Sequence, residues 1–117
     1  MTSLERLGFE PLGDVVLARL GGQVDLSNAP SVQERLLGAV PNTASMLLLD
    51  LSEADYLDSS GVRLIFVLAE RLQSRGQRLE LVVPDRAAVK RVLTLTEVHR
   101  IVPIVDSVAA ALQDGSG

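Results

Sequence analysis

The sequence contains no cysteine, which excludes disulfide bonds, thiolate metal sites and cysteine nucleophiles together. Aromatic residues make up only 3% of the chain, so its core must be aliphatic. Lys90 is the single lysine and the formal net charge is −4 at pH 7, so no basic cluster favours binding to nucleic acid. No apolar run approaches the roughly 18 residues of a membrane span, and no secretory signal pattern opens the chain. We therefore expect a soluble cytoplasmic domain.

Residues 1–117 suffice for a single domain that buries about two thirds of the surface of its unfolded chain. Apolar residues make up 47% of the sequence, which is enough for a core. Strand-like segments alternate with helical segments of about ten residues, a pattern typical of an α/β fold with a mostly parallel sheet. A hairpin formed by residues 1–12 and 15–20 makes the expected sheet mixed. A flexible tail is expected at 113–117.

Short aliphatic runs predict the remaining strands. The segment from Met46 to Leu51 is nearly all aliphatic, as expected of a central strand covered on both faces. Gly21-Gly22 is expected to end the second strand of the hairpin. Further strands are expected at 79–83 and at 101–105, and Pro103 places the last of these at an edge of the sheet.

Capping residues predict where helices begin. Ser27 or Asn28 can cap a first helix, and Pro30 fits its first turn. Asp85 is expected to cap a later helix, which follows the strand at 79–83.

The most informative helix is predicted over residues 62–75 and follows a polar loop at 52–57. At about 100° per residue, one side of this helix is apolar and should face the core. That side consists of Val62, Ile65, Leu68, Ala69 and Leu72.

The turn Asp58-Ser59-Ser60-Gly61 places two hydroxyls and a carboxylate at the start of this helix. Unpaired backbone N–H groups and the positive end of the helix dipole favour an anion there. The turn is therefore a suitable place for a reversible phosphate. On residue types alone, a plain cap and first turn is the other interpretation.

These residues resemble a known signature. Asp50-Leu51-Ser52 followed by Tyr56-Leu57-Asp58-Ser59-Ser60-Gly61 resembles that of the anti-sigma factor antagonists, which are STAS domains. Gly22-Gln23-Val24-Asp25 is similar to the family's Gly-x-Leu-Asp ahead of the first helix. The segment 84–98 resembles its later Pro-x-x-x-Val-x-Arg-x-Leu sequence.

The sequence departs from the family pattern in two places. Val62 and Arg63 stand where Leu-Gly usually follows the motif glycine, and Glu97 stands where a glycine is usual. The first departure changes the surface beside the serines, and so bears on the identity of the partner more than on the fold.

The resemblance implies a phosphorylation-controlled partner switch in transcription regulation. The unmodified protein would bind an anti-sigma factor with serine kinase activity and so release a sigma factor. Phosphate on Ser59 would block that binding, and a serine phosphatase would restore it. The resemblance implies that Asp25 contacts the partner, and Asp58 and Ser60 beside Ser59 are expected to join it. On the helix itself, Val67 falls among the polar residues, and with Arg63 and Phe66 it is a candidate second contact patch. Asp25 is expected at the same carboxyl edge of the sheet as Asp58.

Other functional classes remain open on the sequence. A STAS domain can also be an accessory subunit, for example of a lipid-transport ATPase. A receiver domain would be phosphorylated on Asp50, but Lys90 lies inside a predicted helix rather than after a strand. An enzyme has little support: His99 is the only histidine, and no Gly-x-Ser-x-Gly or nucleotide-binding loop occurs. We therefore expect no catalytic residues, cofactor or metal.

Overall fold

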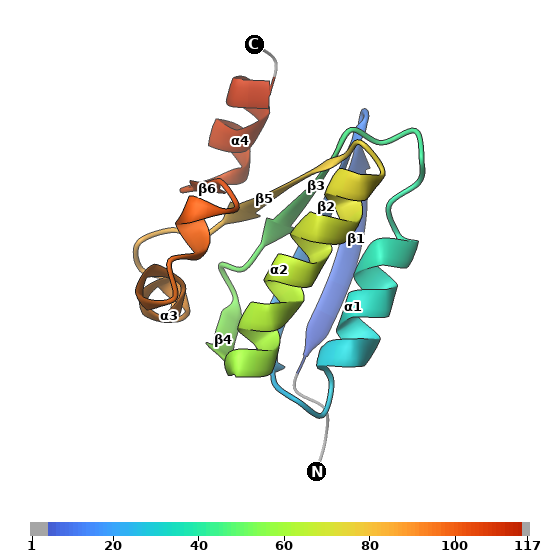
Figure 1. Ribbon diagram of the computed structural model, residues 1–117. Helices are drawn as coiled ribbons and strands as arrows, with labels where there is room; N and C mark the ends of the chain where they lie inside the picture. Colours follow the sequence, from blue (N-terminus) through green and yellow to red (C-terminus); the bar gives the residue numbers. More distant parts are fainter. Residues whose placement is uncertain (1–4, 116–117) are drawn as a thin grey trace.

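The computed structural model describes residues 5–115 and confirms the α/β class (Figure 1). In chain order the elements are β1 (Arg6–Leu12), β2 (Val15–Val24), α1 (Ala29–Gly38), β3 (Met46–Asp50), β4 (Ala54–Leu57), α2 (Ser59–Ser74), β5 (Arg78–Val82), α3 (Lys90–Leu95), the 3₁₀ turn η1 (Val98–Arg100), β6 (Ile104–Val105) and α4 (Val108–Gly115).

The sheet is mixed and mostly parallel, as predicted. Its strands lie in the order β1-β2-β3-β5-β6, and only the β1–β2 hairpin is antiparallel. The short strand β4 lies off this path and pairs in parallel with the last residues of β2. The end of β2 therefore links the main sheet to the segment that leads into α2.

Helices cover both faces of the sheet. Alternate residues of β2 point to opposite faces, as the pleat of a strand requires. Val16 and Ala18 pack in the cluster beneath α1 and α2, which lie side by side in Figure 1. Leu17 packs on the other face, in the smaller cluster that contains Ala111 of α4. None of the helices described is long and apolar enough to cross a membrane.

The predicted core face of α2 is largely confirmed. Val62, Ile65, Leu68 and Leu72 are buried, whereas Ala69 is only half-buried. Leu64, which the periodicity places beside the polar side, is also buried because α1 packs along α2.

Two expectations for the first half of the chain are wrong. The strand expected to end at Gly21-Gly22 continues to Val24, with Gly22 at a φ of 82° and a bulge between Gly22 and Gln23. The segment 52–57, expected to be a polar loop, contains β4. Both differences have one cause, since the extra residues of β2 and β4 pair with each other.

The second half of the chain also differs in its bounds. Asp85 does not cap a helix: α3 begins only at Lys90, and the Asp85 carboxylate lies 3.6 Å from the Lys90 ammonium. β6 is confined to Ile104–Val105, although its predicted edge position is confirmed. Of the tail expected at 113–117, residues 113–115 belong to α4, and 116–117 lie outside the described residues.

Candidate functional site

Two aspartates meet where β2 and β4 end. Val24 and Leu57 are register partners, and each is followed directly by an aspartate, Asp25 and Asp58. The Asp58 N–H donates to the Val24 carbonyl at 3.2 Å, which continues the pairing beyond the strands. The structure therefore brings Asp25 and Asp58 to one edge of the sheet, as the sequence predicts.

Asp58 is the N-cap residue of α2. Its Oδ1 accepts hydrogen bonds from the N–H groups of Ser60, at 2.8 Å, and Gly61, at 3.1 Å. Its backbone is extended, with φ −86° and ψ −169°, as is usual for an N-cap. The cap fixes the direction in which the first turn of the helix leaves the strand.

Ser59 is the first residue of α2 and is exposed, whereas Ser60 is half-buried. The Ser59 hydroxyl therefore lies at the positive end of a 16-residue helix, in contact with solvent. A modifying protein can reach this hydroxyl without any unfolding of the domain.

Asp25 is held by its own loop. Its Oδ1 accepts hydrogen bonds from the Ser27 hydroxyl, at 2.5 Å, and from the Ser27 N–H, at 2.9 Å. These bonds, the hydroxyl first, hold the pKa of Asp25 below its usual value because they favour the ionised carboxylate. Asp25 is therefore a preformed negative charge beside the turn.

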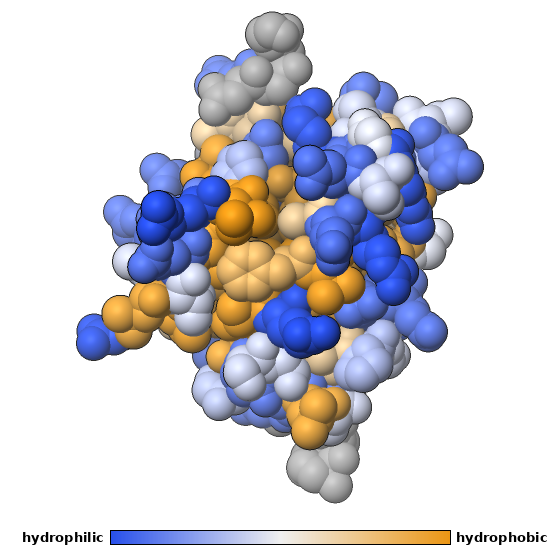
Figure 2. Space-filling model, viewed as in Figure 1, coloured by the Kyte–Doolittle hydropathy of each residue, from blue (hydrophilic) through white to orange (hydrophobic). Residues whose placement is uncertain are grey.

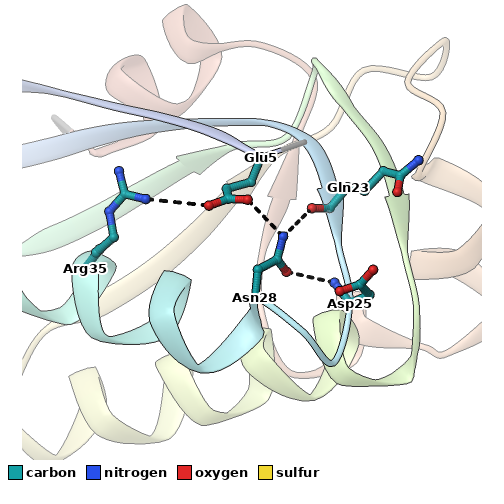
Figure 3. Close-up of polar contacts among 5 residues, drawn as sticks. All are labelled: Glu5, Gln23, Asp25, Asn28 and Arg35. Carbon is teal, nitrogen blue, oxygen red and sulfur yellow. Dashed lines mark hydrogen bonds and ion pairs between the residues drawn. The ribbon is translucent and has the colours of Figure 1, made fainter. Parts of the chain in front are cut away.

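Asn28 ties the same loop to the rest of the domain (Figure 3). Its Oδ1 accepts from the Asp25 N–H at 2.9 Å, and its Nδ2 donates to the Gln23 carbonyl at 2.9 Å and to the Glu5 carboxylate at 3.1 Å. Glu5 also pairs with Arg35 of α1, at 3.9 Å. Asn28 occupies the predicted N-cap position of α1, but its side chain bonds these groups instead of the helix N–H groups.

An apolar hollow of about 600 Å³ lies beside Ser59, between β4, the start of α2 and α3. We call it the α2–α3 hollow. It is lined by Asp55, Tyr56, Leu57, Asp58, Ser59, Val62, Ala88, Val89, Arg91, Val92, Leu95 and Thr96. Tyr56 is 52% exposed and Leu95 is 68% exposed, although both are large and apolar.

Sequence reasoning missed this hollow because its walls come from distant segments. The only local signal is Leu95, an apolar residue that does not share the helical face of Val89, Val92 and Leu93. Such a residue gains meaning only when α3 is placed opposite β4.

The three remaining predicted contact residues lie further along α2. Arg63 is exposed, and Phe66 and Val67 are half-buried. Phe66 lines a second hollow, of about 520 Å³, with Glu70 and Ile101 among its other walls. Figure 2 shows apolar surface gathered in the middle of this face, beside α2. Phe66 therefore does not line the hollow that contains Ser59.

In the described part of the chain, the residues that a receiver domain, an enzyme or a metal site would use do not come together in a site. The Asp50 carboxylate accepts from the N–H and hydroxyl of Ser52, at 2.9 and 2.6 Å, and Lys90 pairs with Asp85. His99 is exposed. Within residues 5–115, no three His, Cys, Asp or Glu side chains gather as metal ligands would.

Comparison with known proteins gives matches to one family and to proteins of similar fold. The STAS domain family profile matches residues 9–111. The TM1081 homolog of Thermotoga neapolitana is 30% identical over 110 residues, 93% of this chain and 96% of that protein. The anti-sigma-F factor antagonist RsfB of Mycobacterium tuberculosis is 29% identical over 77 residues, 66% of this chain and 61% of RsfB. A solved anti-sigma factor antagonist from Mycobacterium paratuberculosis shares the fold, with a TM-score of 0.82 over 94% of this chain and 92% of that one, at 22% identity.

Proposed function

The chain belongs to the STAS domain family, and we propose that it is an anti-sigma factor antagonist whose binding is switched off by phosphate on Ser59. The unmodified protein binds an anti-sigma factor in the cytoplasm and frees a sigma factor. That partner carries the kinase activity and the ATP, and a serine phosphatase reverses the modification. The name of RsfB supports the antagonist role.

One observation carries the proposal: an exposed serine hydroxyl at the mouth of an apolar hollow, next to a capping carboxylate. A partner that covers an apolar hollow at the surface removes it from water, which lowers the free energy of the complex. Ser59 lies at its rim, so any group added to Ser59 enters the covered area. Modification and docking therefore compete for the same place.

The proposed docking surface joins the α2–α3 hollow to the acidic edge beside it. Asp25 and Asp58 supply negative charge, and Ser60 and Arg63 continue the surface along the first turns of α2. Phe66 and Val67 extend it along the same helix as a second contact. Tyr56 and Leu95 are its exposed apolar residues.

Electrostatics explains how phosphate would release the partner. Phosphoserine adds about −1.5 to −2 charge at neutral pH. The domain itself tolerates this charge because it sits at the positive end of α2. In the complex, the charge would be crowded against Asp58 and Asp25 and lose its water, at a cost of several kcal/mol. Since about 1.4 kcal/mol corresponds to tenfold in affinity, release needs no large change of shape.

The test begins with the anti-sigma factor that co-purifies from host lysate, incubated with this protein and ATP. Phosphopeptide mapping should find phosphate on Ser59, and Ser59→Ala should abolish its incorporation. Ser60→Ala is the matched control, since it removes the neighbouring hydroxyl and should still be modified. Phosphate on Ser60 instead of Ser59 would contradict the assignment.

Binding then tests the electrostatic account. Ser59→Ala should bind the anti-sigma factor as the unmodified protein does, whereas Ser59→Asp should lose it. If Ser59→Asp binds as tightly as the wild type, charge at this position does not control docking. Co-purification with an ATP-binding cassette protein, and with no anti-sigma factor, would favour an accessory role in transport instead.

A further inference from the structure

The outer edge of β1 offers a second interaction surface. β1 is the edge strand of the sheet and pairs only with β2 among the described strands. Five of its seven residues are exposed, including Phe9, which is 42% exposed. An exposed edge strand carries unpaired backbone groups that another strand can bind.

The hairpin fixes which backbone groups face outward. Leu12 and Val15 are register partners across the two-residue turn Gly13-Asp14, so they form the hydrogen-bonded pair that closes the hairpin. Bonding to β2 alternates from there, and the N–H and C=O groups of Leu7 and Phe9 point away from the sheet. Pro11 points its nitrogen the same way, which is the position an edge proline requires.

The side chains of β1 are self-complementary when a second copy runs antiparallel to it about Gly8. Arg6 then lies opposite Glu10 of the second copy, and Leu7 lies opposite its Phe9. Arg6 and Glu10 share the α4 face of the sheet, whereas Leu7 and Phe9 share the α1 face, because Phe9 is the register partner of Ala18. Opposite charges and apolar pairs in such positions stabilise strand pairing.

Neighbouring registers lose this match. Side chains keep their faces only when the register moves by two residues. A shift one way places Arg6 opposite Gly8, and a shift the other way places it opposite Leu12. Both shifts remove the two ion pairs between the copies.

We infer that two copies of this chain associate through β1, antiparallel and centred on Gly8, so that their sheets become continuous. Leu7 and Phe9 exchange backbone hydrogen bonds with Phe9 and Leu7 of the second copy. Pro11, which has no N–H, lies beyond these bonds and limits the pairing to this short segment. The inference goes beyond the proposed function, since none of these residues lines the α2–α3 hollow.

The ion pairs within each copy are compatible with this pairing. Glu10 already binds Arg19 at 3.0 Å on the same face. Arg6 forms no ion pair with any carboxylate of residues 5–115. In the dimer, Glu10 would lie between Arg19 of its own copy and Arg6 of the second copy.

Sedimentation velocity on the full chain tests the inference. The wild type should sediment as a species of twice 12.5 kDa. Arg6→Glu and Glu10→Arg each place like charges opposite each other, so each alone should weaken dimerisation by roughly tenfold or more. An equimolar mixture of the two variants restores both opposite-charge pairs and should form a heterodimer.

Glu34→Arg is the matched control, since it makes the same charge change at an exposed position of α1 and should remain dimeric. Circular dichroism establishes that each variant is folded. A wild type that is monomeric up to millimolar concentration would overturn the inference. So would dimers that both single variants leave intact, or a mixture of the variants that stays monomeric. Loss of the dimer without loss of Ser59 phosphorylation would separate this surface from the proposed switch.

Discussion

Gly61, in the first turn of α2, packs directly against Leu57, the last residue of β4. A β-carbon on Gly61 would lie 3.1 Å from Cβ of Leu57 and 3.1 Å from the Val24 carbonyl oxygen. The glycine of the Asp-Ser-Ser-Gly turn is thus needed for close packing, because it lets the helix approach the paired ends of β2 and β4.

Replacing Gly61 with alanine should therefore destabilise the domain. Overpacking costs typically 1–3 kcal/mol, and the better helix propensity of alanine recovers about 1 kcal/mol, so we expect a net loss of about 1 kcal/mol. Urea unfolding of Gly61→Ala measures it. Gly38→Ala, at the open end of α1 with no atom within 4 Å of the new β-carbon, should not be destabilised. Equal effects of the two substitutions would contradict the packing argument.

The cap formed by Asp58 can be separated from its charge. Asp58→Ala removes both acceptor bonds to Ser60 and Gly61 and should lower the free energy of unfolding by about 1 kcal/mol. Asp58→Asn keeps a capping oxygen and should stay close to wild type in the same urea titration. A large loss of stability in Asp58→Asn would mean that the negative charge itself stabilises the helix start.

Leu95 should matter for docking and not for stability. Because it is 68% exposed, Leu95→Asp should change the free energy of unfolding by no more than about 0.5 kcal/mol. The same change places a charge in the α2–α3 hollow and should weaken binding of the anti-sigma factor by about tenfold or more. Calorimetric titration measures this affinity. Ala109→Asp is the control, since it adds the same charge at an exposed position of α4, on the other face of the sheet and outside that hollow. Comparable losses of affinity from both variants would argue against a role for the hollow.

The backbone at Glu97 is left-handed, with a φ of 59°. This conformation explains why the family usually has glycine at this position. Such a conformation costs a non-glycine residue about 1–2 kcal/mol, so Glu97→Gly should raise the free energy of unfolding by up to about 1 kcal/mol. Glu97→Ala keeps the strain and loses the exposed pair with Arg100, and should gain nothing. Thermal unfolding of the two variants distinguishes strain from a lost ion pair.

The pKa of Asp25 is a direct test of its loop. It should lie below 3.8, because the hydroxyl and N–H of Ser27 favour the ionised carboxylate, and Ser27→Ala should raise it towards that value. Since the folded-state pKa is the lower one, ionised Asp25 favours folding above about pH 4, and this contribution disappears as the pH falls through the folded-state pKa. NMR titration of the carboxyl carbon follows both proteins. An unchanged pKa in Ser27→Ala would show that the hydroxyl bond is not the cause.

The features that depend on residues close together in the sequence could be predicted best. The buried strand at Met46, the apolar face of α2 and the carboxylate at the start of this helix all follow from local patterns. β4 did not, because its four residues include Asp55 and exposed Tyr56, and they form a strand only by pairing with the end of β2. Pairing with β4 also extends β2 beyond Gly22, although Gly21-Gly22 alone predicts a turn.

The second gap concerned the segment after β5. Asp85 is a residue that commonly caps helices, but the segment after it forms turns and α3 begins only at Lys90. Val89 and Leu93 are buried, and this packing fixes the position of the short helix. Leu95 and Tyr56 line the same hollow only because α3 lies in that position. A hollow whose walls come from separate elements leaves little trace in the sequence of any one of them, here only the exposed Leu95.

Because β4 is held by so few register positions of β2, its amide protons should exchange with solvent through local opening, whereas those of β3, paired on both sides, should wait for global unfolding. The turn that carries Ser59 follows β4 and would move with it. Local opening of β4 would therefore displace the start of α2 while the strands of the main sheet stay paired.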